Sequence, residues 1–147
     1  MMRKLMSILV TAAILMSTSV ALASNDDVAP YSSDYIDSYS ILLTPDRNGE
    51  MTAKYAVFAT GRMNKVGAYK LTLEEEWGTD KWATSEVIYG DDDPDSFYGE
   101  NVYDHAGNYT FKNLTPGVRY RVILTAYAGD RTGSDQKTLT STAKTCK

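Results

Sequence analysis

Alternation of apolar and polar residues dominates the chain after residue 38. It is clearest over residues 68–75, where Leu71 and Leu73 fall on one side and Thr72 and Glu74 on the other. A period of two predicts a β-strand with one buried face. No window of the chain shows a sustained helical period of apolar residues, so the pattern favours β-structure throughout.

Seven such stretches, separated by clusters of Gly, Pro, Asn and Asp, predict seven strands. They are expected at residues 39–44, 51–60, 68–75, 82–89, 109–114, 119–127 and 137–145. The clusters between them predict turns, among them one at residues 61–67 and a long acidic loop at residues 90–107. We therefore predict an all-β fold, a two-sheet antiparallel sandwich of about seven strands over residues 39–147.

The first 23 residues predict a cleaved signal peptide. A basic start at Arg3 and Lys4 is followed by an apolar run to Val20 and by the small-x-small sequence Ala21-Leu22-Ala23. A membrane anchor would need a basic flank after this run, and the chain instead continues into acidic residues at 26 and 27. We expect cleavage before Ser24, a secreted, extracellular protein, and a loose N-terminal lead-in over residues 24–38.

Charge narrows the classes of partner. The chain has 15 Lys and Arg against 19 Asp and Glu, a formal net charge of −4. Loss of Arg3 and Lys4 with the signal would make the protein more acidic still. Because an acidic surface does not attract nucleic acid or anionic lipid, we expect no nucleic acid and no membrane after signal cleavage. The expected partner is an unknown extracellular protein or glycan.

Cys146 is the only cysteine, so the fold can contain no internal disulfide and must be stabilised by packing. It lies one residue from the last residue of the sequence, where chains often fray. We therefore expect an exposed, idle thiol on a monomeric protein. The alternative is an intermolecular disulfide at Cys146 that links two copies.

The stretch from Tyr109 to Ala126 carries the most specific signal for the fold. A predicted strand ends at Leu114, turns at Pro116-Gly117 and resumes with Tyr120 in an alternating run. This Leu-x-Pro-Gly-x-x-Tyr sequence resembles a strand-to-strand corner of fibronectin type III domains, which are immunoglobulin-like sandwiches. The resemblance implies a structural corner in which Tyr120 buries its ring and ties its hydroxyl to the backbone a few residues upstream, while Leu114 closes the end of the core.

A second resemblance covers more of the chain. Residues 60–68, the sequence Leu71-x-Leu73-x-Glu75 and the tryptophan soon after it are similar to an uncharacterised family of small secreted proteins of Gram-positive bacteria. That family has no assigned activity. The resemblance implies secretion and a β-sandwich, and it implies no chemistry.

Catalytic motifs are absent from the sequence. His105 is the only histidine, and there is no Gly-x-Ser-x-Gly elbow and no His-Glu-x-x-His motif. Pairs of carboxylates are the one catalytic arrangement that the sequence leaves open. We expect a protein that is not an enzyme, with no catalytic residue and no cofactor.

Asp91, Asp93 and Asp95 form a weak candidate for a calcium site. Their spacing matches the start of an EF-hand loop, which needs a Gly at its sixth position and a Glu at its twelfth. Here Ser96 and Val102 occupy those positions. The pattern therefore favours a solvated acidic loop, with calcium-dependent adhesion as the alternative.

Aromatic residues are concentrated between positions 77 and 109. We expect Trp82, Tyr89 and Tyr109 to lie in the core or in cross-strand pairs, which sheets favour, and the rings in the acidic loop to be exposed. Exposed rings can stack on sugars while nearby carboxylates and amides bind the hydroxyl groups. The candidate binding loop comprises Asp95, Phe97, Tyr98, Asn101, Tyr103 and Asp104.

These observations predict a secreted, non-catalytic binding module that acts through its surface loops, because loops at one end of such sandwiches commonly carry recognition. A carbohydrate-binding or calcium-dependent adhesion module is the alternative.

Overall fold

The computed structural model describes residues 27–29 and 33–147. The predicted signal peptide at residues 1–23 lies outside these ranges. Within them, no helix has the length and apolar character needed to cross a membrane. The described chain is mostly β-structure, with 70% of it in strands and 6% in helices, so the predicted all-β class is confirmed.

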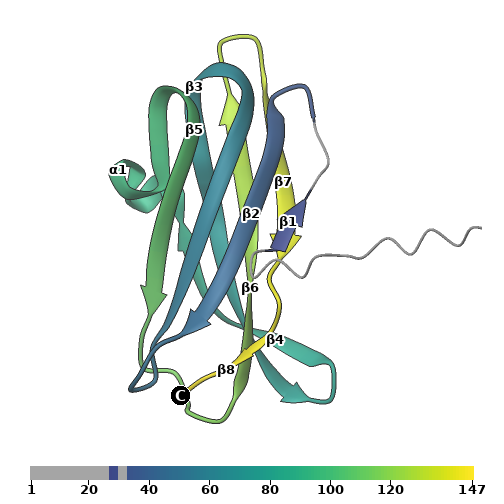
Figure 1. The fold of residues 1–147 in the computed structure, drawn as a ribbon, viewed down its shortest axis with the longest axis vertical. Coiled ribbons are helices and arrows are strands. Elements are labelled where there is room, and N and C mark those ends of the chain that lie inside the picture. The colour runs from purple at the N-terminus through teal and green to yellow at the C-terminus, as the bar shows by residue number, and fades with distance from the viewer. Residues whose placement is uncertain (1–26, 30–32) are drawn as a thin grey trace, which may run out of the picture.

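Eight strands, one 3-10 turn and one short helix make up the described chain (Figure 1). They are β1 (Asp27–Ala29), β2 (Ile36–Pro45), β3 (Met51–Gly78), β4 (Lys81–Tyr89), η1 (Gly90–Asp92), α1 (Pro94–Phe97), β5 (Tyr98–Phe111), β6 (Arg119–Gly129), β7 (Ser134–Thr140) and β8 (Lys144–Thr145). The strands form one antiparallel sheet in the order β1-β2-β3-β6-β7. In addition, β4 and β5 pair with β3, and β8 pairs with β6.

The 28-residue strand β3 is the centre of the sheet. Its first part pairs with β2 and β5, and its last part pairs with β6 and β4. The predicted turn at residues 61–67 is therefore wrong, because the chain bends there without leaving the sheet. Between Phe58 and Met63, four residues of β3 stand opposite a single residue of β5. A bulge of this kind bends a strand and interrupts its alternation, which is why the sequence pattern suggests a turn.

Most of the predicted loop at residues 90–107 is also strand, because β5 begins at Tyr98. Residues 98–102 pair with residues 63–67 of β3, and residues 104–111 pair with residues 51–58. The part of the predicted loop before β5 contains η1 and α1. The prediction failed because few side chains of β5 are buried, so the strand lacks the apolar alternation that marks strands in a sequence.

The remaining differences concern strand ends. The strand β2 begins at Ile36, and β1 pairs with it from within the stretch predicted as a loose lead-in. The strand predicted at residues 109–114 ends at Phe111, and the last predicted strand is divided into β7 and β8. The strands predicted at residues 82–89 and 119–127 lie within β4 and β6.

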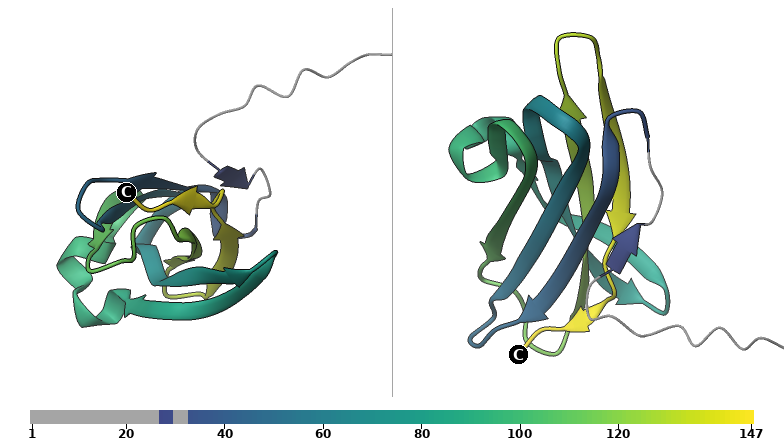
Figure 2. Two further views of the ribbon diagram at one scale, coloured as in Figure 1. Left: turned by 90° about the horizontal axis from the view of Figure 1, so that it is seen from below. Right: turned by 45° about the horizontal axis from the view of Figure 1, so that its top comes forward.

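The sheet curls so that β2 contacts β6 and β7, and from below the strands surround a common interior (Figure 2). Across this closure the Tyr39 hydroxyl donates to the Thr138 carbonyl oxygen at 3.5 Å. Alternate side chains fill the interior, and Leu71 and Leu73 are fully buried. Burial of each side chain of this size stabilises the folded state by about 1.5–3 kcal/mol. The other large side chains with full burial are Tyr120, Phe111, Ile36, Ile41, Leu43, Met51, Leu124, Val57, Val66 and Val122.

The turn from β5 into β6 places Tyr120 at the end of the core. Its ring is 1% exposed, and the backbone N–H of Thr115 donates to its hydroxyl oxygen at 3.0 Å. Leu114 packs against the core from the same turn, and Gly117 has a φ of 85° that a side chain would disfavour. This is the tie between ring and backbone that the resemblance to a fibronectin type III corner implies.

Cys146 is buried, with 3% exposure, and the expectation of an exposed thiol is wrong. Its carbonyl oxygen accepts from the Gly117 N–H, and its own N–H donates to the Val118 carbonyl oxygen, both at 2.9 Å. The Gly49 N–H donates to the carbonyl oxygen of Lys147. These bonds hold the last residues against two turns, which the chain position of Cys146 could not reveal.

We expect the thiol of Cys146 to react with iodoacetamide at least about 100-fold more slowly in the folded protein than in urea, because the folded protein must first open locally. Burial raises the pKa of the thiol, so the reactive thiolate forms at a higher pH in the folded than in the unfolded chain. Mass spectrometry of timed samples from pH 7 to 10 measures both effects. Equal rates in the two states would show that Cys146 is not buried in solution.

Candidate functional site

The structure separates the residues of the predicted binding loop. Asp95 is exposed in α1, whereas Phe97 and Tyr98 are buried at 3% and 6% exposure and are not the exposed rings that the sequence predicts. Asn101, Tyr103 and Asp104 are exposed on β5. A single binding loop therefore does not exist, and the exposed members lie on two different elements.

Tyr103 belongs to a small group beside the bulge of β3. Its ring is 58% exposed, and the guanidinium carbon of Arg62 lies 5.2 Å from the ring centroid. Phe58, 44% exposed, stands in register with Asp104. Two exposed aromatic rings, one on β3 and one on β5, therefore lie near the bulge.

His105 has a structural environment. Its Nε2 lies 3.2 Å from the Ser96 carbonyl oxygen and 3.4 Å from the hydroxyl of Tyr55, which itself donates to the Ser96 carbonyl oxygen at 3.2 Å. Burial, and then the nearby Asp93 carboxylate, raise the pKa of Tyr55, so its hydroxyl remains a donor. These contacts tie α1 to β3 and β5.

The acidic residues before α1 do not converge on a metal position. Asp91 forms an ion pair with Lys65 at 3.1 Å, and the Asp93 carbonyl oxygen accepts from the backbone N–H groups of Ser96 and Phe97. Among the described residues, no group of three His, Cys, Asp or Glu side chains could hold a metal ion. The segment Asp91–Asp95 is instead a set of exposed carboxylates over β3 and β5.

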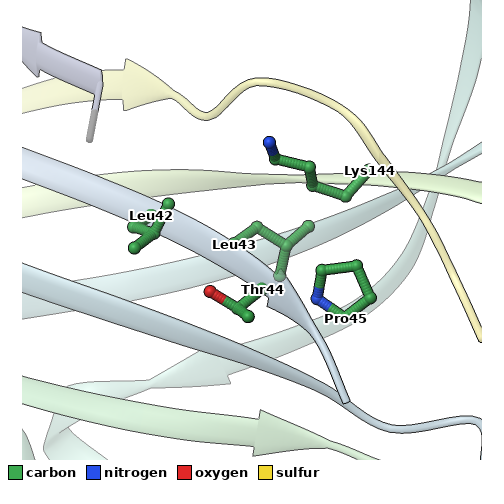
Figure 3. A pocket seen from close by; sticks show the side chains of 5 residues that line it. All are labelled: Leu42, Leu43, Thr44, Pro45 and Lys144. Atoms are coloured by element: carbon green, nitrogen blue, oxygen red, sulfur yellow. The ribbon is translucent and has the colours of Figure 1, made fainter. Parts of the chain in front are cut away.

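Two cavities lie along β2. The larger, about 250 Å³, is lined by Leu42, Leu43, Thr44, Pro45 and Lys144 (Figure 3). The second, about 230 Å³, is lined by Ser40, Leu42, Lys54, Tyr55 and Ala56. Neither lining contains a carboxylate, a histidine or a cysteine, and each contains one lysine.

The most organised group of polar and aromatic side chains surrounds Lys65 on the outer side of the sheet. The ammonium nitrogen of Lys65 lies 3.9 Å from the ring centroid of Tyr98 and 5.6 Å from that of Tyr127. The same nitrogen is 3.1 Å from Oδ1 of Asp91. The two rings are nearly perpendicular, at 81°, with centroids 6.2 Å apart. We call Tyr98, Tyr127 and Asp91 the tyrosine cage.

Strand register explains why the tyrosine cage forms. Gly67 of β3 pairs with Tyr98 of β5 on one side and with Tyr127 of β6 on the other. Gly67 carries no side chain to separate the two rings, and Lys65, two residues earlier, projects from the same side of the strand. An alanine Cβ at Gly67 would lie 2.0 Å from the carbonyl oxygen of Phe97. The glycine therefore also allows the α1–β5 junction to approach the strand.

Electrostatics in the tyrosine cage favour a cation. The Lys65 ammonium, followed by the Tyr98 hydroxyl, lowers the pKa of Asp91, so the carboxylate stays ionised. Burial, and then Asp91, raise the pKa of Tyr98, so this ring stays neutral. The Tyr98 hydroxyl is buried and has no hydrogen-bond partner of good geometry among the described residues.

A second tyrosine pair extends the surface toward the solvent. Tyr69 and Tyr89 pack edge to face with centroids 6.3 Å apart, and Tyr89 is 43% exposed. Tyr89 directly precedes Gly90, where an added Cβ would lie 3.0 Å from the ring of Tyr98. The sequence places Tyr98 and Asp91 in the right region, but it does not show that Lys65 and Tyr127 meet them. The only sequence signal is a lysine two residues before a glycine in a predicted turn.

The projecting end of the β3–β4 hairpin carries a different aromatic cluster. The guanidinium carbon of Arg121 lies 4.3 Å from the Trp82 ring centroid, and Arg121 pairs with Glu74 at 2.6 Å. Arg119 pairs with Glu76 at 3.0 Å. These contacts attach the hairpin to β6. Both arginines are paired with glutamates of the hairpin, so we assign this cluster a structural role.

Comparison with known proteins finds no matching family model, no matching curated protein and no matching solved structure.

Proposed function

We propose that this chain is a secreted, non-catalytic binding module that contacts an extracellular partner through the tyrosine cage, Tyr89 and the acidic segment Asp91–Asp95. The observation that carries the proposal is that the exposed ring of Tyr89 and the exposed carboxylates of Asp91–Asp95 lie beside the pair Tyr98 and Tyr127, which Lys65 covers. Tyrosine is enriched at recognition surfaces, because its ring gives a large contact area while its hydroxyl binds polar groups.

The architecture supports a two-layer sandwich of the fibronectin type III or immunoglobulin-like kind. The bulge bends β3, so that β2 pairs with the strand before the bulge and β4 and β6 pair with it after the bulge, while β5 pairs with it on both sides. Contacts of β2 with β6 and β7 across the interior are consistent with two packed layers. The buried ring of Tyr120 at the β5–β6 turn supports the same assignment. Scaffolds of this kind present binding residues on a fixed frame.

Site-specific photo-crosslinking tests the binding surface. Tyr89 is replaced by p-benzoylphenylalanine in the protein expressed by its source organism, and Tyr103, another exposed tyrosine on a neighbouring element, is the matched control position. We expect ultraviolet light to yield a discrete adduct from position 89 and none from position 103.

The double variant Asp92→Asn, Asp95→Asn, with the photoreactive residue still at position 89, checks the role of the acidic segment. Removal of two exposed carboxylates should weaken that adduct without changing the melting temperature, since neither side chain is buried. Adducts of equal yield from both positions, or adducts that ignore the acidic residues, would contradict the proposed surface.

A further inference from the structure

We infer that the tyrosine cage is a binding site for an ammonium cation carried by the partner, and that Lys65 occupies this site in the free protein. The inference rests on the proposed function of the same surface and names the chemistry of its ligand: a primary or quaternary alkylammonium group.

The geometry matches what an ammonium group requires. A cation is attracted to the face of an aromatic ring within about 6 Å of its centroid, and cages of such rings recognise quaternary ammonium ligands. In the tyrosine cage two perpendicular rings form two walls, and the Asp91 carboxylate supplies the opposite charge at 3.1 Å from the bound nitrogen. The position of the Lys65 nitrogen therefore marks where a ligand nitrogen would sit.

The resident lysine is exchangeable. The side chain of Lys65 is 38% exposed and that of Asp91 is 60% exposed, so the ion pair between them is a surface pair. Such pairs add only about 0–1 kcal/mol to the stability of a protein, because solvent screens the charges and both side chains lose conformational entropy. The aliphatic stem of Lys65 can swing into solvent while the rings, which are set by strand register, stay in place. An incoming cation thus meets a preformed site.

The surrounding charge favours a cation over other ligands. Asp92, Asp93 and Asp95 are exposed next to the tyrosine cage, and the whole chain is acidic. A surface of one sign raises the local concentration of ligands of the opposite sign. The competing interpretation, that Lys65 serves only to fasten η1 to the sheet, predicts no affinity for an external cation once Lys65 is removed.

Titration with choline chloride, followed by the amide signals of Gly67 and Gly90 in ¹H–¹⁵N spectra, tests the site. We expect weak saturable binding to the intact protein and about 10-fold tighter binding to Lys65→Ala, in which the competing cation is gone. In that background Tyr127→Leu, which keeps bulk but removes the π face, and Asp91→Asn should each weaken binding about 3- to 10-fold. Lys54→Ala removes an exposed lysine from the same strand, away from the tyrosine cage, and should leave binding unchanged.

The neutral isostere 3,3-dimethyl-1-butanol separates charge from shape. We expect no saturable shift with it; binding equal to that of choline would overturn the assignment to a cation. Absence of choline binding up to about 100 mM in folded Lys65→Ala, and in Lys65→Ser as a second variant, would also overturn it. Choline binding without any adduct from position 89 would contradict the proposed partner surface and support the cation site. Adducts without choline binding would support the partner surface and contradict the cation site.

Discussion

Replacing Tyr120 by alanine is expected to lower the free energy of unfolding by about 3–5 kcal/mol, the usual cost of truncating a fully buried aromatic residue. The ring of Tyr120 closes the core at the β5–β6 turn and is 1% exposed. We expect the cavity to stay largely unfilled, because hydrogen bonds of Gly117 and Val118 to Cys146 hold the neighbouring turn in place. Since domains of this size are stable by about 5–15 kcal/mol, the variant should be near its folding limit.

The variant Tyr120→Phe isolates the hydroxyl. It keeps the ring and removes the acceptor of the Thr115 N–H, so we expect a loss of about 1 kcal/mol. Urea denaturation followed by circular dichroism measures both variants, with Tyr103→Phe as the control at an exposed ring. A cost for Tyr120→Ala no larger than that for Tyr120→Phe would show that the ring does not fill the core.

Replacing Gly67 by alanine is expected to cost about 3 kcal/mol, at the upper end of the range for inserted atoms in a packed interior. The new Cβ would lie 2.0 Å from the Phe97 carbonyl oxygen and 2.9 Å from the Tyr98 Cα. Both are backbone atoms, so no side-chain rotation can relieve the contact. The α1–β5 junction must move outward, and Tyr98 must move with it. We therefore also expect the choline affinity of the Lys65→Ala background to fall.

Gly61 provides a matched control within the same strand, because a Cβ there would meet no atom within 4 Å. Gly61→Ala should stay within about 0.5 kcal/mol of the parent protein. Thermal and urea unfolding of the two variants side by side measure the difference. If both variants proved equally stable, the close approach of β3 to the α1–β5 junction would be disproved.

The sequence was informative wherever alternation was unbroken. Leu71 and Leu73 reveal the buried face of β3, and the spacing of Leu114 and Tyr120 marks a corner, because both signals are local. It failed at residues 61–67 and 98–107. The strand is bulged in the first stretch and mostly solvent-facing in the second, so neither shows the period that burial imposes.

The candidate site was harder to foresee than the fold. Asp91 and Tyr98 lie in the region that the sequence singles out, but Lys65 lies in a predicted turn and Tyr127 in a core strand. They meet only because Gly67 is paired on both sides, a relation of register between strands distant in the chain. Cys146 illustrates the same limit, since backbone bonds to Gly117 and Val118 decide its burial.

The continuity of β3 through its bulge has a consequence for how the molecule melts. The hydrogen-bond ladders on both flanks of this strand share one backbone, and its two ends anchor different neighbours. If either end of β3 detaches, the neighbouring strands at the other end also lose hydrogen-bond partners. The two regions are therefore expected to unfold in one cooperative transition. Fragments split at the bulge would each retain unpaired backbone N–H and C=O groups, so we expect residues 33–147 to unfold as a single unit.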